Sequence, residues 1–178
     1  MAYSMRMNKE IAIFNGIIRN YFPNIAKAVD NGEADPEDFN IERLFEKCIA
    51  KESGLTWANE EGEAYEKYDL VEDKSDAKTS SVSLRWNVDK RLPEGGCDVV
   101  TGTISNTGGK EGDLRVVVYN SYIQKLDYFL IPHKHISEFQ KSVGDKCAIG
   151  LSYSLTKEKY GKMEVFRVET FKDICVVK

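Results

Sequence analysis

Two apolar runs in the second half of the chain restrict its fold more than any other feature. They are Asp113–Asn120 and Leu126–Pro132, and a short polar segment separates them. Runs of this length that are rich in β-branched and aromatic residues are typical of strands, and a short polar connection between two such runs indicates a hairpin. We therefore expect an antiparallel hairpin at the centre of a β-sheet.

Other segments place this hairpin in a larger sheet. Further strands are predicted at residues 65–71, 78–86, 98–104, 146–155 and 163–168. Residues 87–110 contain Pro93 and two glycine pairs, so apart from the short candidate strand they are expected to form a loop. Pro132 ends the second apolar run, and the spacing of apolar residues after it predicts a helix over 133–143.

The N-terminal third of the chain has helical patterns. Apolar residues recur at helical spacing over Asn8–Val29, with a break expected near Pro23. A second helix is predicted to follow the cap Asp35 and to end near Gly54. We expect an α/β fold with a mixed central β-sheet flanked by helices and preceded by N-terminal helices. It would be one domain over 1–178, with a helical part at 1–54 and the sheet core at 55–178.

Composition excludes some classes of protein and favours others. Of the 178 residues, 42% are hydrophobic and 30% are charged, as expected of a globular core. No apolar run is long enough to cross a membrane, and the charged N-terminus is unlike a signal peptide, so we expect a cytoplasmic protein without a membrane partner. The net charge of −4 argues against a passive nucleic-acid coat protein. Four widely spaced cysteines without a CxxC pair predict buried thiols rather than a zinc site.

Acidic residues and a lysine gather between residues 68 and 84. Asp69 lies at the end of one predicted strand, and Asp76 and Lys78 begin the next. Residues two apart in a strand point to the same face, so Asp76 and Lys78 are expected side by side. Two carboxylates can hold Mg²⁺, and a lysine can orient or deprotonate a water and offset phosphate charge. These groups are what hydrolysis of a phosphodiester bond needs.

Spacing alone leaves other interpretations of this stretch open. The Asp-x-Lys pattern is frequent by chance in a highly charged chain, and the polar turn could be a solvated hairpin. Glu72 and Asp73 compete with Asp69 as the first acid. The four glutamates between residues 60 and 66 are typical of a solvated face, although one of them, or Glu42 or Glu46, could assist a metal.

The stretch resembles the PD-(D/E)xK nucleases, the restriction-endonuclease-like family. Asp69 matches the first acid, and Asp76-Ala77-Lys78 matches the second acid, spacer and lysine, although Tyr68 replaces the usual proline. The resemblance implies a restriction-endonuclease-like core and a Mg²⁺-dependent endonuclease that cleaves double-stranded DNA, often as a homodimer. Asp69 and Asp76 would then bind the metal, Lys78 would position or deprotonate the water, and Glu46 would contact a metal-bound water.

Other motifs favour structural or supporting roles. His133 and His135 have no carboxylate or cysteine near them in sequence, so a structural role is expected. Basic residues of the second half could contact phosphates, and these are Lys110, Arg115, Lys125, Lys134, Lys141, Lys157, Lys159 and Lys162. The alternative function is a non-catalytic module that binds DNA or protein. Convergence of Asp69, Asp76 and Lys78 in a cleft would favour the nuclease over this alternative.

Overall fold

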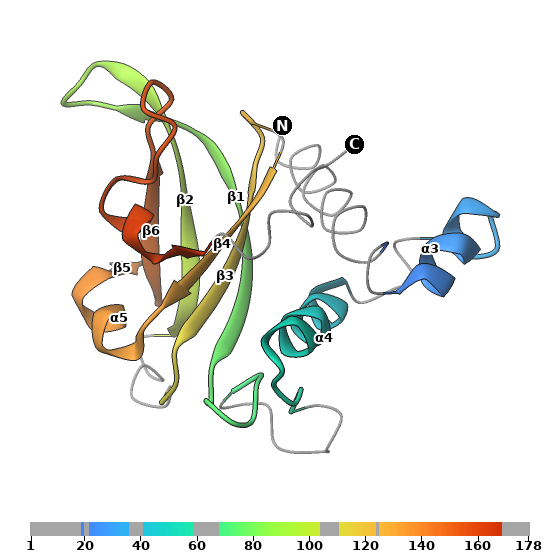
Figure 1. Cartoon of the computed structure of the whole chain (residues 1–178). Helices are drawn as coiled ribbons and strands as arrows, with labels where there is room; N and C mark the ends of the chain where they lie inside the picture. The colour runs from blue at the N-terminus through green and yellow to red at the C-terminus, as the bar shows by residue number, and fades with distance from the viewer. Residues whose placement is uncertain are drawn as a thin grey trace.

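The computed structural model describes residue 19 and residues 22–35, 41–58, 68–103, 111–123 and 125–168. Within these residues the chain is an α/β protein with a mixed sheet flanked by helices (Figure 1). The helices are α3 (Pro23–Asp30), α4 (Ile41–Ser53) and α5 (His133–Phe139), together with the 3₁₀ helix η4 (Gly161–Phe166). The strands are β1 (Asp76–Asn87), β2 (Leu92–Thr103), β3 (Leu114–Asn120), β4 (Lys125–Ile131), β5 (Gln140–Val143), β6 (Lys146–Tyr153) and β7 (Arg167–Val168).

The seven described strands lie in the order β5-β6-β2-β1-β3-β4-β7, and the sheet divides at β1. Residues 76–82 of β1 pair in parallel with β3, whereas residues 83–87 pair antiparallel with β2. Beyond this point β2 pairs with β6. In Figure 1, β1 accordingly bows away from β2 below their shared hairpin. The first half of β1 and the second half of β2 therefore form two walls that separate from one another.

A glycine allows the two strands to meet where the sheet divides. A Cβ atom at Gly95 would lie 3.1 Å from side-chain atoms of both Val82 and Tyr122. Such a contact is tighter than ordinary van der Waals packing, so the Val82 and Tyr122 side chains would have to shift by a few tenths of an ångström to admit a side chain here. Glycine inside a strand often marks a close approach of this kind.

Two apolar clusters hold the sheet from its two faces. On one face, Phe45, Cys48 and Ile49 of α4 pack with Ala77 of β1 and Val117 of β3. The opposite face is covered by a second cluster, whose members include Val82, Val99, Val116, Val118, Phe129, Ile149, Leu151, Tyr160 and Met163. The alternation of Val116, Val117 and Val118 between the clusters follows from the two-residue period of a strand. The apolar run of β3 is thus buried on both faces.

Several sequence predictions are confirmed. The hairpin of β3 and β4 forms with a continuous register from Leu114↔Ile131 to Asn120↔Lys125. Pro23 begins α3, as a proline in the first helical turn can, and α4 ends at Ser53 as expected. The residues before Arg19 and residues 36–40, where the remaining parts of these helices were predicted, lie outside the described residues.

Other predictions are wrong in detail. Residues 92–103, predicted to be mainly loop, form the long strand β2 near the middle of the sheet, and the β3–β4 hairpin is displaced to one side. Instead of a strand over 65–71, the described residues 68–71 contain a single bridge from Leu70 to Trp57, and 65–67 lie outside the described part. The helix predicted to reach residue 143 ends at Phe139 and continues as β5. Most of the strand predicted at 163–168 is η4.

None of the helices in the described ranges is long and apolar enough to cross a membrane.

Candidate functional site

A closed turn between residues 69 and 75 brings the predicted acids together. The backbone N–H groups of Asp69 and Leu70 both donate to the carbonyl oxygen of Ser75, at 2.9 and 3.1 Å. Because the chain folds back at this point, Asp69 reaches the start of β1, where its Oδ2 accepts the Ala77 N–H at 2.7 Å. Asp69 is thereby fixed at the end of the strand that carries Asp76 and Lys78.

Arg115 of β3 holds this turn against the sheet. Its Nη2 lies 2.7 Å from Asp73 Oδ2, and its Nε donates to Ser75 Oγ at 3.0 Å. Its Nη1 donates to Tyr128 Oη at 2.9 Å and to Ser53 Oγ at 3.3 Å. Burial opposes ionisation of Asp73, but hydrogen bonds from Arg115 and Ser75 keep the pKa of its carboxyl below the ordinary value. Arg115 therefore ties the turn to β4 and to the end of α4.

The acids that compete for the first position of the motif have different contacts in the turn. Asp73 binds Arg115 and Ser75, and Glu72 accepts hydrogen bonds from the Thr56 N–H at 2.8 Å and the Thr56 hydroxyl at 2.6 Å. Both carboxylates thus stabilise the loop that surrounds the site. Asp69 is the acid of this turn that acts electrostatically on Lys78.

Asp69, Asp76 and Lys78 lie together at the start of β1. Lys78 Nζ is 3.3 Å from Asp76 Oδ2, and the Lys78 side chain is 35% exposed. Asp69 and Asp76 are buried, with 7% and 5% of their surface exposed. Burial opposes the charged form of Lys78, but the negative charges of Asp76, Asp69 and Glu46 raise its pKa above the ordinary value. Lys78 is therefore a stable ammonium group at neutral pH.

Glu46 approaches the same cluster from α4. Its Oε2 accepts the Trp57 Nε1–H at 3.1 Å, and Trp57 is bridged to Leu70 beside the turn. Burial, together with the negative charge of Asp69, raises the pKa of Glu46 from 4.5 to about 7. Since this value is close to neutral pH, Glu46 can gain or lose a proton under ordinary solution conditions.

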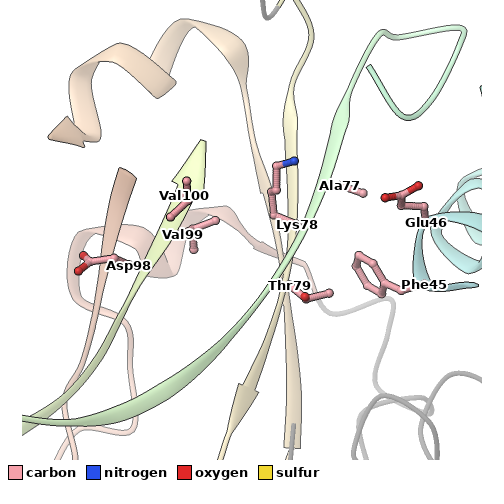
Figure 2. A pocket seen from close by; sticks show the side chains of 8 residues that line it. All are labelled: Phe45, Glu46, Ala77, Lys78, Thr79, Asp98, Val99 and Val100. Atoms are coloured by element: carbon pink, nitrogen blue, oxygen red, sulfur yellow. The ribbon is translucent and has the colours of Figure 1, made fainter. Parts of the chain in front are cut away.

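A pocket of about 220 Å³ lies where β1 and β2 separate. Its lining residues are Phe45, Glu46, Ala77, Lys78, Thr79, Asp98, Val99 and Val100. Figure 2 shows the Glu46 carboxylate directed from α4 toward β1, while the Asp98 carboxylate on β2 is turned away from Lys78. Asp98 instead lies 2.8 Å from Lys141 Nζ. The pocket therefore combines charged groups from α4 and β1 with an apolar wall from β2.

The chemistry of the carboxylates fits a hard divalent cation. Asp69 and Asp76 together contribute two negative charges against one positive charge on Lys78, in a place where both acids are buried. Mg²⁺ is commonly held by one or two carboxylates, with water and substrate phosphate as its other ligands. A site of three or more His, Cys, Asp or Glu ligands does not occur in the described ranges. The residues present thus suit a two-carboxylate Mg²⁺ site that is completed by water and phosphate.

Other predicted residues have structural contacts or are not described. His133 donates its N–H to Asp113 Oδ1 at 2.8 Å, and His135 lies 2.9 Å from Glu138 and packs against Phe166. Both contacts agree with the structural role expected of the two histidines. Lys110, the glutamates at 60–66 and the side chain of Glu42 lie outside the described part of the chain.

Two features of the site are not predicted by the sequence pattern: the contact of Trp57 with Glu46 and the supporting role of Arg115. Arg115 was considered only as a phosphate-contacting residue, although its side chain is 11% exposed in the ion pair with Asp73. An arginine inside an otherwise apolar strand is a usable signal, because a buried guanidinium requires acidic and polar partners. Its partners are 40 and 42 residues away in sequence, so the pattern could not identify them.

No protein-family model matches this sequence, and comparison with curated proteins found no significant match.

Proposed function

We propose that this protein is a Mg²⁺-dependent endonuclease that hydrolyses phosphodiester bonds in DNA and has a restriction-endonuclease-like core. The observation that carries the proposal is the placement of two buried carboxylates, Asp69 and Asp76, beside Lys78, which together with Glu46 lines a pocket between separating strands. Acid, acid and lysine at one end of a sheet are the groups that this reaction needs. The same residues carry the resemblance to PD-(D/E)xK nucleases in the sequence.

Each residue has a distinct role in this proposal. Asp69 and Asp76 hold Mg²⁺, which when bound supplies positive charge to the phosphate and lowers the pKa of water. The raised pKa of Lys78 keeps its ammonium protonated, so Lys78 orients the attacking water and neutralises charge on the phosphate. This favours the positioning role of Lys78 over the role of a base.

Glu46 is the better proton acceptor in the site. Its pKa of about 7 leaves a substantial ionised fraction at neutral pH, and its carboxylate can take the proton that the attacking water loses. The hydrogen bond from Trp57 holds Oε2 of this carboxylate in place. Glu46 thus acts as a base in the proposed reaction, in addition to the contact with a metal-bound water expected from the resemblance.

The proposed substrate is double-stranded DNA. Cutting both strands of a duplex at related positions suits a two-fold symmetric pair of sites, so we propose that the protein acts as a homodimer on such a substrate. Size-exclusion chromatography with light scattering, in the presence and absence of a duplex, measures this state directly. A monomer at all concentrations with DNA would limit the protein to cutting one strand at a time.

Cleavage assays with Mg²⁺ test the function. Supercoiled plasmid and genomic DNA of several base compositions are incubated with the wild type and with Lys78→Met and Asp76→Asn. We expect Mg²⁺-dependent cleavage by the wild type and a loss of at least about 100-fold in each variant. The matched controls are Lys134→Met and Asp145→Asn, because both residues are exposed and lie outside the site.

Two results would contradict the proposal. One is a wild-type protein that cleaves none of these DNAs and binds no Mg²⁺ by calorimetry. DNA binding without cleavage would then identify the non-catalytic module. The other is cleavage that survives both site variants at the control rate, since the reaction would then not depend on the acid–lysine cluster.

A further inference from the structure

The ends of β1 and β2 extend beyond the rest of the sheet as a two-stranded ribbon. Pairing of β3 with β1 ends at Val82, and pairing of β6 with β2 begins at Gly95. The register between β1 and β2 continues outward from Ser83↔Gly96 to Asn87↔Leu92. We call residues 83–94 the arm. Figure 1 shows it projecting from the end of the molecule opposite the turn that carries Asp69.

Polar contacts stiffen the tip of the arm. Asn87 Nδ2 donates to Glu94 Oε2 at 2.7 Å, and the Lys90 N–H donates to Asn87 Oδ1 at 2.9 Å. The Lys90 ammonium also forms an ion pair with Glu94. These contacts join both strands and the turn between them, so the tip presents one shape to a partner and loses little conformational entropy on binding.

Large apolar side chains are exposed on this preorganised tip. Trp86 is 65% exposed, Val88 is 76% exposed and Leu92 is 44% exposed. The turn that follows β6 lies beside the arm, because Tyr153 pairs with Gly95, and this turn adds Leu155 at 41% exposure. Because Trp86 pairs with Pro93 and Leu92 pairs with Asn87, Trp86 and Leu92 lie on opposite faces of the ribbon, so the arm offers apolar contacts on both of its faces.

Most of the exposed charge beside these side chains is positive, with Asp89 and Glu158 as the exposed acids among the basic residues. Arg91 at the tip and Lys157, Lys159 and Lys162 near the adjoining turn are all exposed. Within the described ranges no ion pair involves any of these four residues. The whole chain carries a net charge of −4, so this positive group opposes the overall balance. Charge of this sign is complementary to a phosphate backbone.

We propose that the arm and the adjoining turn bind the groove of duplex DNA at a distance from the cleavage site. This inference rests on the proposed function, since it concerns the flank of the same DNA. A two-stranded ribbon is narrow enough for the major groove. Lys78 and Val88 are ten residues apart along β1, which corresponds to at most about 33 Å at ~3.3 Å per residue. A duplex lying along β1 would therefore meet the tip within about one helical turn of the scissile phosphate.

Binding measurements without Mg²⁺ test the arm separately from the chemistry. All proteins in this test carry Lys78→Met, so that none of them cleaves. The arm variant adds Arg91→Gln and Lys159→Gln, and its binding to a labelled duplex is measured by fluorescence anisotropy. The control combines Lys134→Gln with Lys146→Gln, which removes the same charge from exposed positions elsewhere. We expect binding about tenfold weaker in the arm variant only, with the slope of log K against log salt reduced by about 2. Equal effects of both pairs would overturn the inference, because only overall charge would matter.

Duplex length provides a second test. A duplex of about 6 base pairs is only about 20 Å long at ~3.4 Å per base pair, well below the span of at most about 33 Å from Lys78 to the tip, whereas one of about 24 base pairs covers the whole span. The arm variant should therefore differ from the wild type only on the longer duplex. In a Trp57→Phe background, DNA should also quench the fluorescence of Trp86. Quenching that instead follows protein concentration, with DNA absent, would show that a second copy covers the arm and would overturn the inference.

The two proposals fail in different ways. If cleavage depends on Lys78 but the arm variant binds DNA as tightly as the protein with an unchanged arm, the proposed role of the arm is contradicted and the proposed nuclease activity is supported. Binding that depends on Arg91 and Lys159 in a protein that cleaves no DNA supports the arm and contradicts the nuclease.

Discussion

Replacement of Glu46 by glutamine should stabilise the protein, and the gain should depend on pH. The folded-state pKa of this carboxyl is about 7, compared with 4.5 for the unperturbed group. The folded state therefore holds the proton more tightly than the unfolded state, and ionising Glu46 costs stability. This cost is absent below about pH 4.5, grows as pH rises toward 7, and is complete above pH 7.

The size of the effect follows from the pKa difference. A difference of one pKa unit corresponds to about 1.4 kcal/mol, so the full cost is about 3 kcal/mol. This figure is an upper bound, because Glu46 is only partly buried, so solvent screens its charge, and because the glutamine amide is also desolvated in the same position. For a chain of this length the corresponding rise in Tm is at most roughly 6–12 °C. The side-chain oxygen of glutamine can still accept the hydrogen bond from Trp57, so loss of that bond does not contribute to the difference in stability between the wild type and Glu46→Gln.

Urea unfolding of the wild type and Glu46→Gln, measured from pH 4.5 to pH 8, tests the prediction. The two proteins should be equally stable at the acidic end, and the variant should be the more stable one above pH 7. Glu33→Gln is the control, since Glu33 is exposed in the turn after α3 and should leave the pH dependence unchanged. A constant difference between wild type and Glu46→Gln across the whole range would refute the argument, because burial of the charge would then have no energetic consequence.

Three further predictions concern the turn and the cation site. Gly112→Ala should destabilise the protein by at least about 2 kcal/mol in chemical unfolding, because its Cβ would lie 2.0 Å from the Lys74 carbonyl oxygen; wild-type stability would contradict this. Arg115→Met should cost about 3 kcal/mol by leaving Asp73 without its ion pair. Adding Asp73→Asn to Arg115→Met should recover part of that loss. If the double variant is no more stable than Arg115→Met alone, the unpaired charge of Asp73 is not the cause of the loss. Mg²⁺ binding at pH 7 should release protons as Glu46 ionises, so the calorimetric enthalpy should change with the ionisation heat of the buffer; an identical enthalpy in all buffers would exclude this linkage.

Local sequence was sufficient for features that depend on period and turn chemistry. The two apolar runs around residues 114–131 predicted the β3–β4 hairpin, because a strand shows its pattern within a few residues. The break predicted near Pro23 has the same origin, since the fixed φ and missing N–H of proline act locally, and α3 begins at this residue. The same-face placement of Asp76 and Lys78 followed from the two-residue period of β1.

Segments with conflicting local signals were interpreted wrongly. Residues 92–103 contain Pro93, Gly95 and Gly96, which are typical of loops, yet they form a strand of twelve residues. Long-range pairing with β1 and β6 outweighs the local preference here. Gly95 leaves room for the Val82 and Tyr122 side chains, which lie 3.1 Å from the position of a Cβ atom, and no local pattern reveals these neighbours.

The candidate site depended on sequence and tertiary structure in different ways. The amino-acid sequence alone determined which chemical groups were available, namely two acids, a lysine and an upstream glutamate. Only the tertiary structure decided that Asp73 binds Arg115 while Asp69 accepts the N–H of Ala77. It also brought Glu46 close enough for the negative charge of Asp69 to raise the pKa of its carboxyl. Only it placed Lys78 and Glu46 in the lining of a pocket between separating strands. Burial and through-space charge set these properties, and both arise from residues far apart in the chain.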